Sequence, residues 1–550
     1  MNPKRILAAI AATLLIATAT EAQITIVPQP QVVRLRPGTV SLPRSPKVYL
    51  SPKAGIAKAY ALGRLKDAGI SAVVVQKPTQ ADISITIGKG SGRKEGYRLT
   101  ATAKPKAAIA VVADDRSGAI YAIESLRQML RHDGGGLSVN ECSITDWPEF
   151  RWRAFMLDEA RHFHGKEMVK RLADEMVGLK MNIFHWHLVD NQGWRIEIKG
   201  YPKLTSVGSL GDYSHPFPGA EKWKEIYPDR ERSYYTQDEI REVVAYCAER
   251  GISVMPEIEV PAHCGAATHA YPELLAQCAD AGAPALFNVA APQFWKFIET
   301  TLTQVVELFP SRLLHIGGDE AYFTRWQNNP DIARLMKEHG LQSLPDVQIY
   351  AINRIQKFLA RKGVQLVGWN EITGDNILNQ AGRGENVAVH LDPGAIVQFW
   401  NGSGDLAKKA IKKGFSIVNS FRYNAYLDYT YNIIPVDEAY NFNPYFEELT
   451  PEENRKVIGL GCQMWGEYTP NTQRLYFQVF PRLAAYAECA WTNVDNKNYA
   501  DFVRRMAPIE KTWLQKGYFT GQPSYTMGVP VYVKEWEYLY NQPAEVERHH

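Results

Sequence analysis

Two adjacent carboxylates, Asp319 and Glu320, follow a pair of glycines, Gly317 and Gly318, at the end of a short apolar run. Neighbouring residues on a regular strand point to opposite faces. Both acids can therefore serve one site only where the strand ends and turns away, and two glycines permit such a turn. We expect the two side chains to diverge toward different parts of one bound substrate.

Acidic and aromatic residues also follow the other apolar runs of this half of the chain. They are Asp158, Glu159, Asp190, Trp194, Glu257, Glu259, Trp369, Glu371, Trp400, Asp428, Trp465 and Glu467. Carboxylates beside indole surfaces suit glycoside cleavage. In that reaction one acid protonates the leaving oxygen, while a second negative group stabilises an oxocarbenium-like transition state. No nucleophilic serine or cysteine motif and no phosphate-binding glycine loop stands out.

The adjacency of the two acids also bears on the mechanism. A retaining glycosidase with a protein nucleophile needs two carboxyl groups that face each other across the scissile bond. Neighbouring acids fit better a reaction in which the substrate supplies the nucleophile and one acid orients it.

Eight apolar, β-rich runs separated by helical stretches must position these residues. They span 154–157, 183–189, 252–258, 313–316, 364–368, 396–399, 417–420 and 458–463. Near-continuous apolar strands that alternate with helices indicate a parallel sheet covered on both faces. Eight such units predict a (β/α)₈ barrel, an α/β fold whose active site lies at the carboxyl ends of the strands.

The chain divides into four predicted segments. Residues 1–22 have the charged, apolar and small-residue order of an export signal, so we expect a periplasmic or secreted protein. Residues 23–147 resemble a small α+β supporting domain with five strand-like runs and two amphipathic helices. Residues 148–518 form the predicted barrel domain, and its last helix covers 499–516. Residues 519–550 are a C-terminal extension without a readable motif.

The composition is that of an ordinary globular protein, with 45% hydrophobic and 22% charged residues in a chain of 550. The formal net charge is +3 and no basic stripe is visible, which argues against a nucleic-acid partner. No segment of the predicted mature chain resembles a membrane span. The six cysteines show no zinc spacing, but Cys264 and Cys278 are close enough in sequence to pair in an oxidising compartment.

Seven ordered motifs resemble glycoside hydrolase family 20, the β-N-acetylhexosaminidases. They are Arg153 with Leu157-Asp158 and Ala160-Arg161-His162-Phe163; His187-Leu188-Val189-Asp190-Asn191-Gln192-Gly193-Trp194-Arg195; Pro256-Glu257-Ile258-Glu259-Val260-Pro261-Ala262-His263; the run from His315 to Glu320; Val367-Gly368-Trp369-Asn370-Glu371; Tyr426-Leu427-Asp428; and Trp465-Gly466-Glu467. The stretch from Ile24 to Pro30 is similar to the family's N-terminal domain.

The resemblance implies an exo-acting, retaining enzyme without a cofactor or metal, whose partner is a glycan or glycoconjugate. The substrate's 2-acetamido oxygen would attack the anomeric carbon and form an oxazolinium ion. Glu320 would be the acid and then the base, with a raised pKa. Asp319 would hold the acetamido N–H, and Tyr426 its carbonyl oxygen. The resemblance further assigns Trp369 and Trp400 to the acetamido pocket, Trp465 to stacking on the sugar, Arg153, Asp428 and Glu467 to its hydroxyls, and Asp190 and His263 to supporting positions near the acid.

Two residues depart from the family pattern. The family commonly has a second aspartate where this chain has Asn191, and glycine where it has Ala262. Asparagine keeps its hydrogen bonds but loses a charge, which predicts altered electrostatics near that subsite. Neither change touches Asp319 or Glu320.

Three other functions compete with this interpretation. A disaccharide-releasing relative, similar to lacto-N-biosidases, would need a wider pocket. A non-catalytic carbohydrate-binding protein would usually lack the proton donor, and Glu320 is present. A metal-dependent barrel hydrolase could use His185 and His187, which lie on one face of a strand, with further ligands from His263, His315 and Asp319. The alternative for these histidines is hydrogen bonding to neighbouring acids.

Overall fold

The computed structural model describes residues 24–133, 136–210, 232–375, 377–378, 384–385, 387–467, 469, 471–518 and 520–521. The predicted export signal and nearly all of the C-terminal extension lie outside these residues. Contacts divide the chain into two compact units between Trp147 and Pro148, with Val27–Gln29 grouped with the second unit. No helix in the described part of the chain has both the length and the apolar character needed to cross a bilayer.

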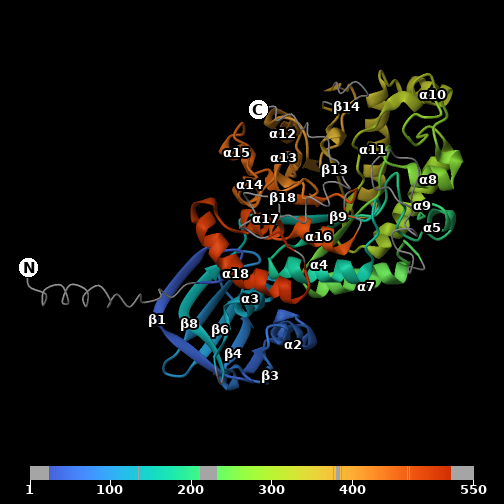
Figure 1. Ribbon diagram of the computed structural model, residues 1–550. Helices are drawn as coiled ribbons and strands as arrows, with labels where there is room; N and C mark the ends of the chain where they lie inside the picture. Colours follow the sequence, from blue (N-terminus) through green and yellow to red (C-terminus); the bar gives the residue numbers. More distant parts are fainter. Residues whose placement is uncertain are drawn as a thin grey trace, which may run out of the picture. The chain divides into compact units, whose positions relative to one another are not determined.

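The first unit is an α+β domain built on one mixed sheet (Figure 1). Pairing is antiparallel from β1 through β8 and β5 to β6, and parallel from β6 through β4 and β2 to β3. Helix α3 packs on β4, β5 and β6, and α2 packs against α3. The elements are β1 (Val32–Pro43), β2 (Lys47–Leu50), α2 (Lys58–Asp67), β3 (Val73–Val74), β4 (Ile83–Ile87), β5 (Tyr97–Thr102), β6 (Ala108–Ala113), α3 (Arg116–Met129), β7 (Arg131–Asp133) and β8 (Gly136–Asp146).

The second unit contains a closed barrel of eight parallel strands. In barrel order these are β9 (Trp152–Asp158), β10 (Ile183–His187), β11 (Ser253–Glu257), β12 (Leu313–His315), β13 (Gln365–Trp369), β16 (Ile396–Phe399), β17 (Ser416–Asn419) and β18 (Val457–Met464). Strand β18 pairs with β9 and closes the ring. The predicted (β/α)₈ fold is confirmed, and each of the eight predicted runs overlaps one barrel strand.

Helices follow the strands and cover the barrel. They are α4 (Lys166–Gly178), α5 (Lys203–Ser206), α7 (Gln237–Glu249), α8 (Gly265–Ala270), α9 (Pro292–Leu308), α10 (Pro330–His339), α11 (Leu344–Arg361), α12 (Gly404–Lys412), α13 (Arg422–Ala425), α14 (Val436–Asn441), α15 (Pro451–Asn454), α16 (Thr472–Val479), α17 (Arg482–Trp491) and α18 (Tyr499–Gln515). Capping boxes begin α7, at Thr236 and Glu239, and α11, at Ser343 and Asp346. Strands β14 (Ile377–Leu378) and β15 (Gly384–Glu385) form a separate pair.

The barrel interior changes from apolar to polar along the strands. A buried apolar cluster lies toward the strand starts: Trp152, Ala154, Ile183, Met255, Val367, Ile396, Val418 and Ile458. Because side chains alternate along a strand, the same inward face then carries Met156 and Asp158 on β9, and His185 and His187 on β10. The apolar layer therefore supports a polar layer at the carboxyl ends of the strands.

Candidate active site

A glycine turn after β12 places the two adjacent acids. Gly317 and Gly318 have φ values of +66° and +95°. A Cβ on Gly317 would lie 1.7 Å from a carboxylate oxygen of Glu259, and one on Gly318 would lie 2.6 Å from Ile372. Only glycine fits both positions, because each combines a left-handed backbone with a close neighbour. Asp319 is buried, whereas the side chain of Glu320 is 39% exposed. The two carboxyls thus differ in exposure, and one oxygen of each lies within 4.8 Å of the other. Their expected divergence toward different parts of a substrate stays a prediction.

His263 lies between these acids and Asp190. Its Nε2 is 3.5 Å from an oxygen of Asp319 and 3.5 Å from an oxygen of Glu320, and its Nδ1 is 3.2 Å from Asp190 Oδ1. Burial lowers the pKa of His263, but the charges of Asp190 and Asp319 outweigh it and hold that pKa well above the usual value. Asp190 and His263 thus lie beside the acid pair, where the resemblance placed them, and His263 is cationic.

The positive charge of His263 affects the pKa values of both acids. Burial raises the pKa of Glu320, but its contact with His263 and the charges of His263 and Arg161 bring it below the ordinary value. The prediction of a raised pKa for Glu320 is therefore wrong for the unliganded protein. Burial raises the pKa of Asp319 to about 7. The negative charge of Glu320 adds to this rise, and the positive charge of His263 opposes it. At neutral pH, Asp319 is accordingly the more protonated of the two.

Four aromatic residues pack together near Asp319, whose charge acts on Tyr426. The rings of Trp400 and Tyr426 stack with centroids 6.5 Å apart and planes within 14°. Trp465 lies 5.8 Å from Trp369 and 5.9 Å from Tyr426. Trp369, Trp400 and Tyr426 are buried in one cluster with Met156, and Trp465 packs against it. The structure thus brings the four predicted aromatic residues into one cage.

Two buried glutamates hold the indoles of this cage. Trp369 Nε1 donates to Glu257 at 2.9 Å, and Trp400 Nε1 donates to Glu371 at 3.0 Å. Burial and the charge of Asp319 raise the pKa of Glu371 to about 8. The sequence marked both glutamates as strand-end acids but gave no sign of these roles, because the contacts join residues on different strands.

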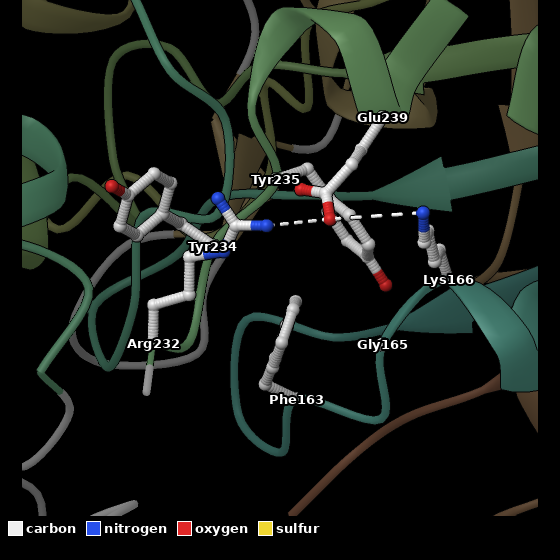
Figure 2. A pocket seen from close by; sticks show the side chains of 7 residues that line it. All are labelled: Phe163, Gly165, Lys166, Arg232, Tyr234, Tyr235 and Glu239. Carbon is white, nitrogen blue, oxygen red and sulfur yellow. Dashed lines mark hydrogen bonds and ion pairs between the residues drawn. The ribbon is translucent and has the colours of Figure 1, made fainter. Parts of the chain in front are cut away.

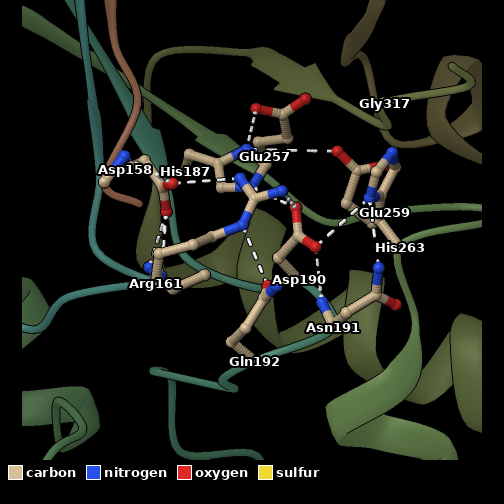
Figure 3. Close-up of polar contacts among 12 residues, drawn as sticks. Asp158, Arg161, His187, Asp190, Asn191, Gln192, Glu257, Glu259, His263 and Gly317 are labelled. Carbon is tan, nitrogen blue, oxygen red and sulfur yellow. Dashed lines mark hydrogen bonds and ion pairs between the residues drawn. The ribbon is translucent and has the colours of Figure 1, made fainter. Parts of the chain in front are cut away.

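Arg161 gathers the carboxylates on the other side of the site. Its guanidinium lies 3.0 Å from Asp158, 2.8 Å from Asp190 and 3.7 Å from Glu467. It also lies 5.2 Å above the ring of Trp465. Figure 3 shows Arg161 pointing between Asp158 and Asp190. The sequence singled out Arg161 only as part of a motif, and the structure places it in the site.

The two predicted hydroxyl-binding carboxylates lie close to each other. Asp428 is buried, and burial and the charge of Glu467 raise its pKa well above the ordinary value. Burial also raises the pKa of Glu467, against the charge of Arg161. Within the described residues, Asp428 Oδ1 has no hydrogen-bond partner. A buried polar atom of this kind is suited to a hydroxyl ligand.

Arg153 does not reach the site, contrary to the role that the resemblance assigned to it. It is the second residue of β9, whereas the site forms around Asp158 at the strand's last residue. Its side chain is fully buried and donates to the carbonyl oxygens of Lys180 and Phe150, both at 2.8 Å. Arg153 therefore stabilises the amino-terminal end of the barrel and is not available to a substrate.

The departure at Asn191 falls next to His263. Asn191 Oδ1 accepts the N–H of Gly265 at 3.0 Å, and its Nδ2 lies 3.5 Å from His263 Nδ1. An aspartate here would add a negative charge beside the cationic imidazole. The asparagine thus removes a charge from the surroundings of the acid pair.

Three of the four histidines considered as metal ligands surround Glu257. His187 Nδ1 lies 2.5 Å, His185 Nε2 2.9 Å and His315 Nδ1 2.7 Å from its carboxylate oxygens. His187 Nε2 bonds Asp190 at 3.0 Å. These contacts fit the alternative in which the histidines pair with neighbouring acids.

Two further features lie apart from this arrangement. All six cysteines are free thiols, so the considered pairing of Cys264 with Cys278 is not formed. A small pocket, drawn in Figure 2, is lined by Phe163, Gly165, Lys166, Arg232, Tyr234, Tyr235 and Glu239. Glu239 lies 2.5 Å from Arg232 and 4.0 Å from Lys166, so the charges that line this pocket pair with one another.

Comparison with known proteins places this geometry in context. Residues 150–494 match the family model "Glycosyl hydrolase family 20, catalytic domain", and residues 23–147 match "Glycosyl hydrolase family 20, domain 2". A β-hexosaminidase of Vibrio furnissii is 34% identical over 71% of this chain and 64% of its own length. One of Porphyromonas gingivalis is 32% identical over 75% of this chain and 53% of its own. The chain thus spans less than two thirds of either relative.

Solved structures show the same fold. The exo-β-N-acetylglucosaminidase of Vibrio harveyi in complex with N-acetylglucosamine is 28% identical, with a TM-score of 0.80 over 91% of this chain and 78% of that one. The β-N-acetylhexosaminidase of Bacteroides fragilis is 28% identical, with a TM-score of 0.78 over 92% of this chain and 99% of that one.

Proposed function

Because the chain belongs to glycosyl hydrolase family 20, we propose that it removes terminal, non-reducing β-linked N-acetylhexosamines from glycans by substrate-assisted catalysis. The observation that carries this proposal is the position of Asp319 and Glu320 on one turn, with a packed cluster of aromatic residues near them. These rings offer an apolar surface for an acetamido methyl group, and the adjacent acids offer one proton donor and one orienting charge.

In the first step the acetamido oxygen attacks the anomeric carbon while Glu320 protonates the leaving oxygen. The glycosidic C–O bond breaks, and an oxazolinium ion and a free alcohol form. In the second step Glu320 takes a proton from water, the water oxygen attacks the anomeric carbon, and the acetamido group is regenerated. The anomeric configuration is retained because inversion occurs twice.

Asp319 orients the nucleophile. Its carboxylate accepts the acetamido N–H, and the hydroxyl of Tyr426 donates to the acetamido oxygen. Trp369 and Trp400 wall the methyl group, and Trp465 stacks on the sugar ring. Arg161, Asp428 and Glu467 bind the hydroxyls at the closed end of the site, which makes the enzyme exo-acting.

Substrate binding reverses the pKa order of the free protein. A hydrogen bond from the acetamido N–H favours the charged form of Asp319, so its pKa of about 7 falls on binding. The new charge on Asp319 disfavours a second charge on Glu320, whose pKa rises. The proton therefore moves to the residue that donates it to the leaving group.

Two aryl substrates that differ only at C2 test the proposed function. We expect hydrolysis of 4-nitrophenyl N-acetyl-β-glucosaminide with a kcat/KM at least about 10³-fold above that for 4-nitrophenyl β-glucoside, because the second sugar lacks the built-in nucleophile. Comparable kcat/KM values would contradict substrate assistance. Binding of the acetamido sugar without hydrolysis would instead identify a carbohydrate-binding protein.

The segment 1–22 also leads us to propose that the protein is exported to the periplasm or the medium. Amino-terminal sequencing of the protein recovered outside the cytoplasm tests this. A mature chain that begins near Gln23 is the expected result.

A further inference from the structure

A continuous chain of buried polar contacts leads from the barrel interior to the acid pair, and Figure 3 shows its members from Glu257 to His263. Glu257 Oε2 lies 2.5 Å from His187 Nδ1, and His187 Nε2 lies 3.0 Å from Asp190 Oδ2. Asp190 Oδ1 lies 3.2 Å from His263 Nδ1, and His263 Nε2 lies 3.5 Å from Glu320. Carboxylate and imidazole groups alternate along this chain. Glu257, His187 and Asp190 are buried, and the side chain of His263 is 13% exposed.

His187 is locked in its doubly protonated form. Each ring nitrogen faces a carboxylate oxygen, so each nitrogen carries a proton to donate. Burial lowers the pKa of His187, but the charge of Glu257 and the bonds to Asp190 and Glu257 hold it well above the ordinary value. Burial likewise raises the pKa of Glu257, and the histidines around it outweigh this and hold the carboxylate ionised.

Asp190 is fixed in charge and in orientation. Its Oδ2 contacts both His187 and Arg161, and its Oδ1 accepts the backbone N–H of Asn191 at 2.5 Å and contacts His263. Burial raises the pKa of Asp190, but Arg161 and His263 outweigh this and hold it well below the ordinary value. Both carboxylate oxygens of Asp190 thus have polar partners, and Oδ1 is the oxygen that orients His263.

We propose that Glu257 and His187 are positioning residues for the general acid: through Asp190 they hold the His263 N–H toward Glu320. This proposal rests on the proposed function, in which Glu320 is the proton donor. Neither residue touches the substrate. They act by keeping Asp190 ionised and oriented toward His263. The imidazole of His263 can then adjust the positive charge next to Glu320 while Glu320 gives up and regains its proton.

The groups that face Glu320 show why the chain matters. His263 from the loop after β11 and Arg161 from the loop after β9 favour its charged form, whereas Asp190 opposes it. The adjacent Asp319 feels the charge of Glu320 in turn. The two cations are both held by Asp190, at 3.2 Å and 2.8 Å. If Asp190 is displaced, the positions of both His263 and Arg161 relative to Glu320 change together. The pKa of Glu320 then no longer suits a residue that must both donate and accept a proton.

Glu257→Gln breaks the first link of this chain while keeping a hydrogen-bond acceptor. Glu257 Oε1 accepts the indole N–H of Trp369 and also faces His315, whereas Oε2 faces both His187 and His185. A glutamine that keeps its oxygen toward Trp369 turns its NH₂ toward the Nδ1–H of His187, where two donors meet. The Glu175→Gln variant is a matched control, because Glu175 is a buried glutamate on α4 that accepts the indole N–H of Trp513 at 2.8 Å.

The test is the dependence of kcat/KM on the leaving group. A donor that protonates the leaving oxygen matters for a poor leaving group and much less for a good one. We expect Glu257→Gln to lower kcat/KM for 4-methylphenyl N-acetyl-β-glucosaminide by about 10-fold to 100-fold, and that for the 2,4-dinitrophenyl analogue by less than about 3-fold. Glu175→Gln should leave both values unchanged.

A double substitution separates positioning from general damage. With the 4-methylphenyl substrate, for which Glu257→Gln alone has the large effect, adding Glu257→Gln to Glu320→Gln should cause no further loss, because the residue through which Glu257 acts is already removed. Equal losses for the two leaving groups, or additive losses in the double variant, overturn the proposal. A wild-type protein that does not hydrolyse the acetamido sugar at all would refute the proposed function instead.

A spectroscopic measurement covers the case in which the variants do not fold. His187→Gln breaks the same link and gives a second variant. In wild-type protein with ¹⁵N-labelled histidine, we expect rings protonated at both nitrogens to persist at pH 8, and His187→Gln should lose one of them. A wild-type spectrum without a doubly protonated ring at pH 8 overturns the chain.

Discussion

Glu320→Gln is expected to lower kcat/KM for 4-methylphenyl N-acetyl-β-glucosaminide by about 10²-fold to 10⁴-fold, the usual contribution of a positioned general acid. The amide cannot donate a proton of comparable acidity to the leaving oxygen, and it cannot deprotonate the water of the second step. Steady-state rates for the wild type and the variant measure the loss. The side chain is 39% exposed, so the melting temperature should change little.

The matched comparison for this prediction is the 2,4-dinitrophenyl glycoside. Its leaving group departs without protonation, so the loss in kcat/KM should be much smaller for this substrate. Because glutamine also fails as the base, the oxazolinium step that follows should then limit kcat. Turnover of both substrates by Glu320→Gln at the wild-type rate would remove Glu320 from the mechanism.

Asp319→Asn is expected to lower kcat/KM for N-acetyl-β-glucosaminides by about 10²-fold to 10³-fold, as removal of one preorganised electrostatic contact at a reacting centre does. If the NH₂ group of asparagine faces the acetamido N–H, two donors meet and the hydrogen bond is lost. Asparagine also carries no negative charge to stabilise the oxazolinium ion. The loss should be the same for 4-methylphenyl and 2,4-dinitrophenyl glycosides, because orientation of the nucleophile precedes departure of either leaving group.

This uniform loss distinguishes Asp319 from Glu320. A loss that depends on the leaving group would show that Asp319 is the proton donor, as its pKa of about 7 in the free protein would allow. A loss of less than about tenfold for both substrates would show that the acetamido group is oriented by other residues.

The barrel and the location of its site were predictable because the signals are local. A run such as 252–258 is apolar along nearly its whole length, and the residues after it are acids and a histidine. In a parallel barrel the carboxyl end of each strand faces the same rim, so acids that follow different strands must converge. Asp190, His263, Asp319 and Glu320 meet for this reason.

The error at Arg153 and the pKa of Glu320 have different causes. Arg153 lies near the start of β9 and Arg161 lies just beyond its end, so only Arg161 is at the carboxyl end of the strand, where the site forms. The pKa of Glu320 depends on His263, whose own charge is set by Asp190 from another strand. Three strands of the first unit, β2, β7 and β8, were also not predicted, because β2 and β7 are short and polar residues interrupt the apolar pattern of β8.

The most direct test of the central claim varies the nucleophile itself. Wild-type kcat/KM is measured for aryl β-glucosaminides that carry N-acetyl, N-fluoroacetyl, N-difluoroacetyl and N-trifluoroacetyl groups. Each fluorine withdraws electrons from the amide oxygen, so kcat/KM should fall at every step, by more than about tenfold over the series. A kcat/KM that stays constant or rises across the series would show that the acetamido oxygen does not attack the anomeric carbon.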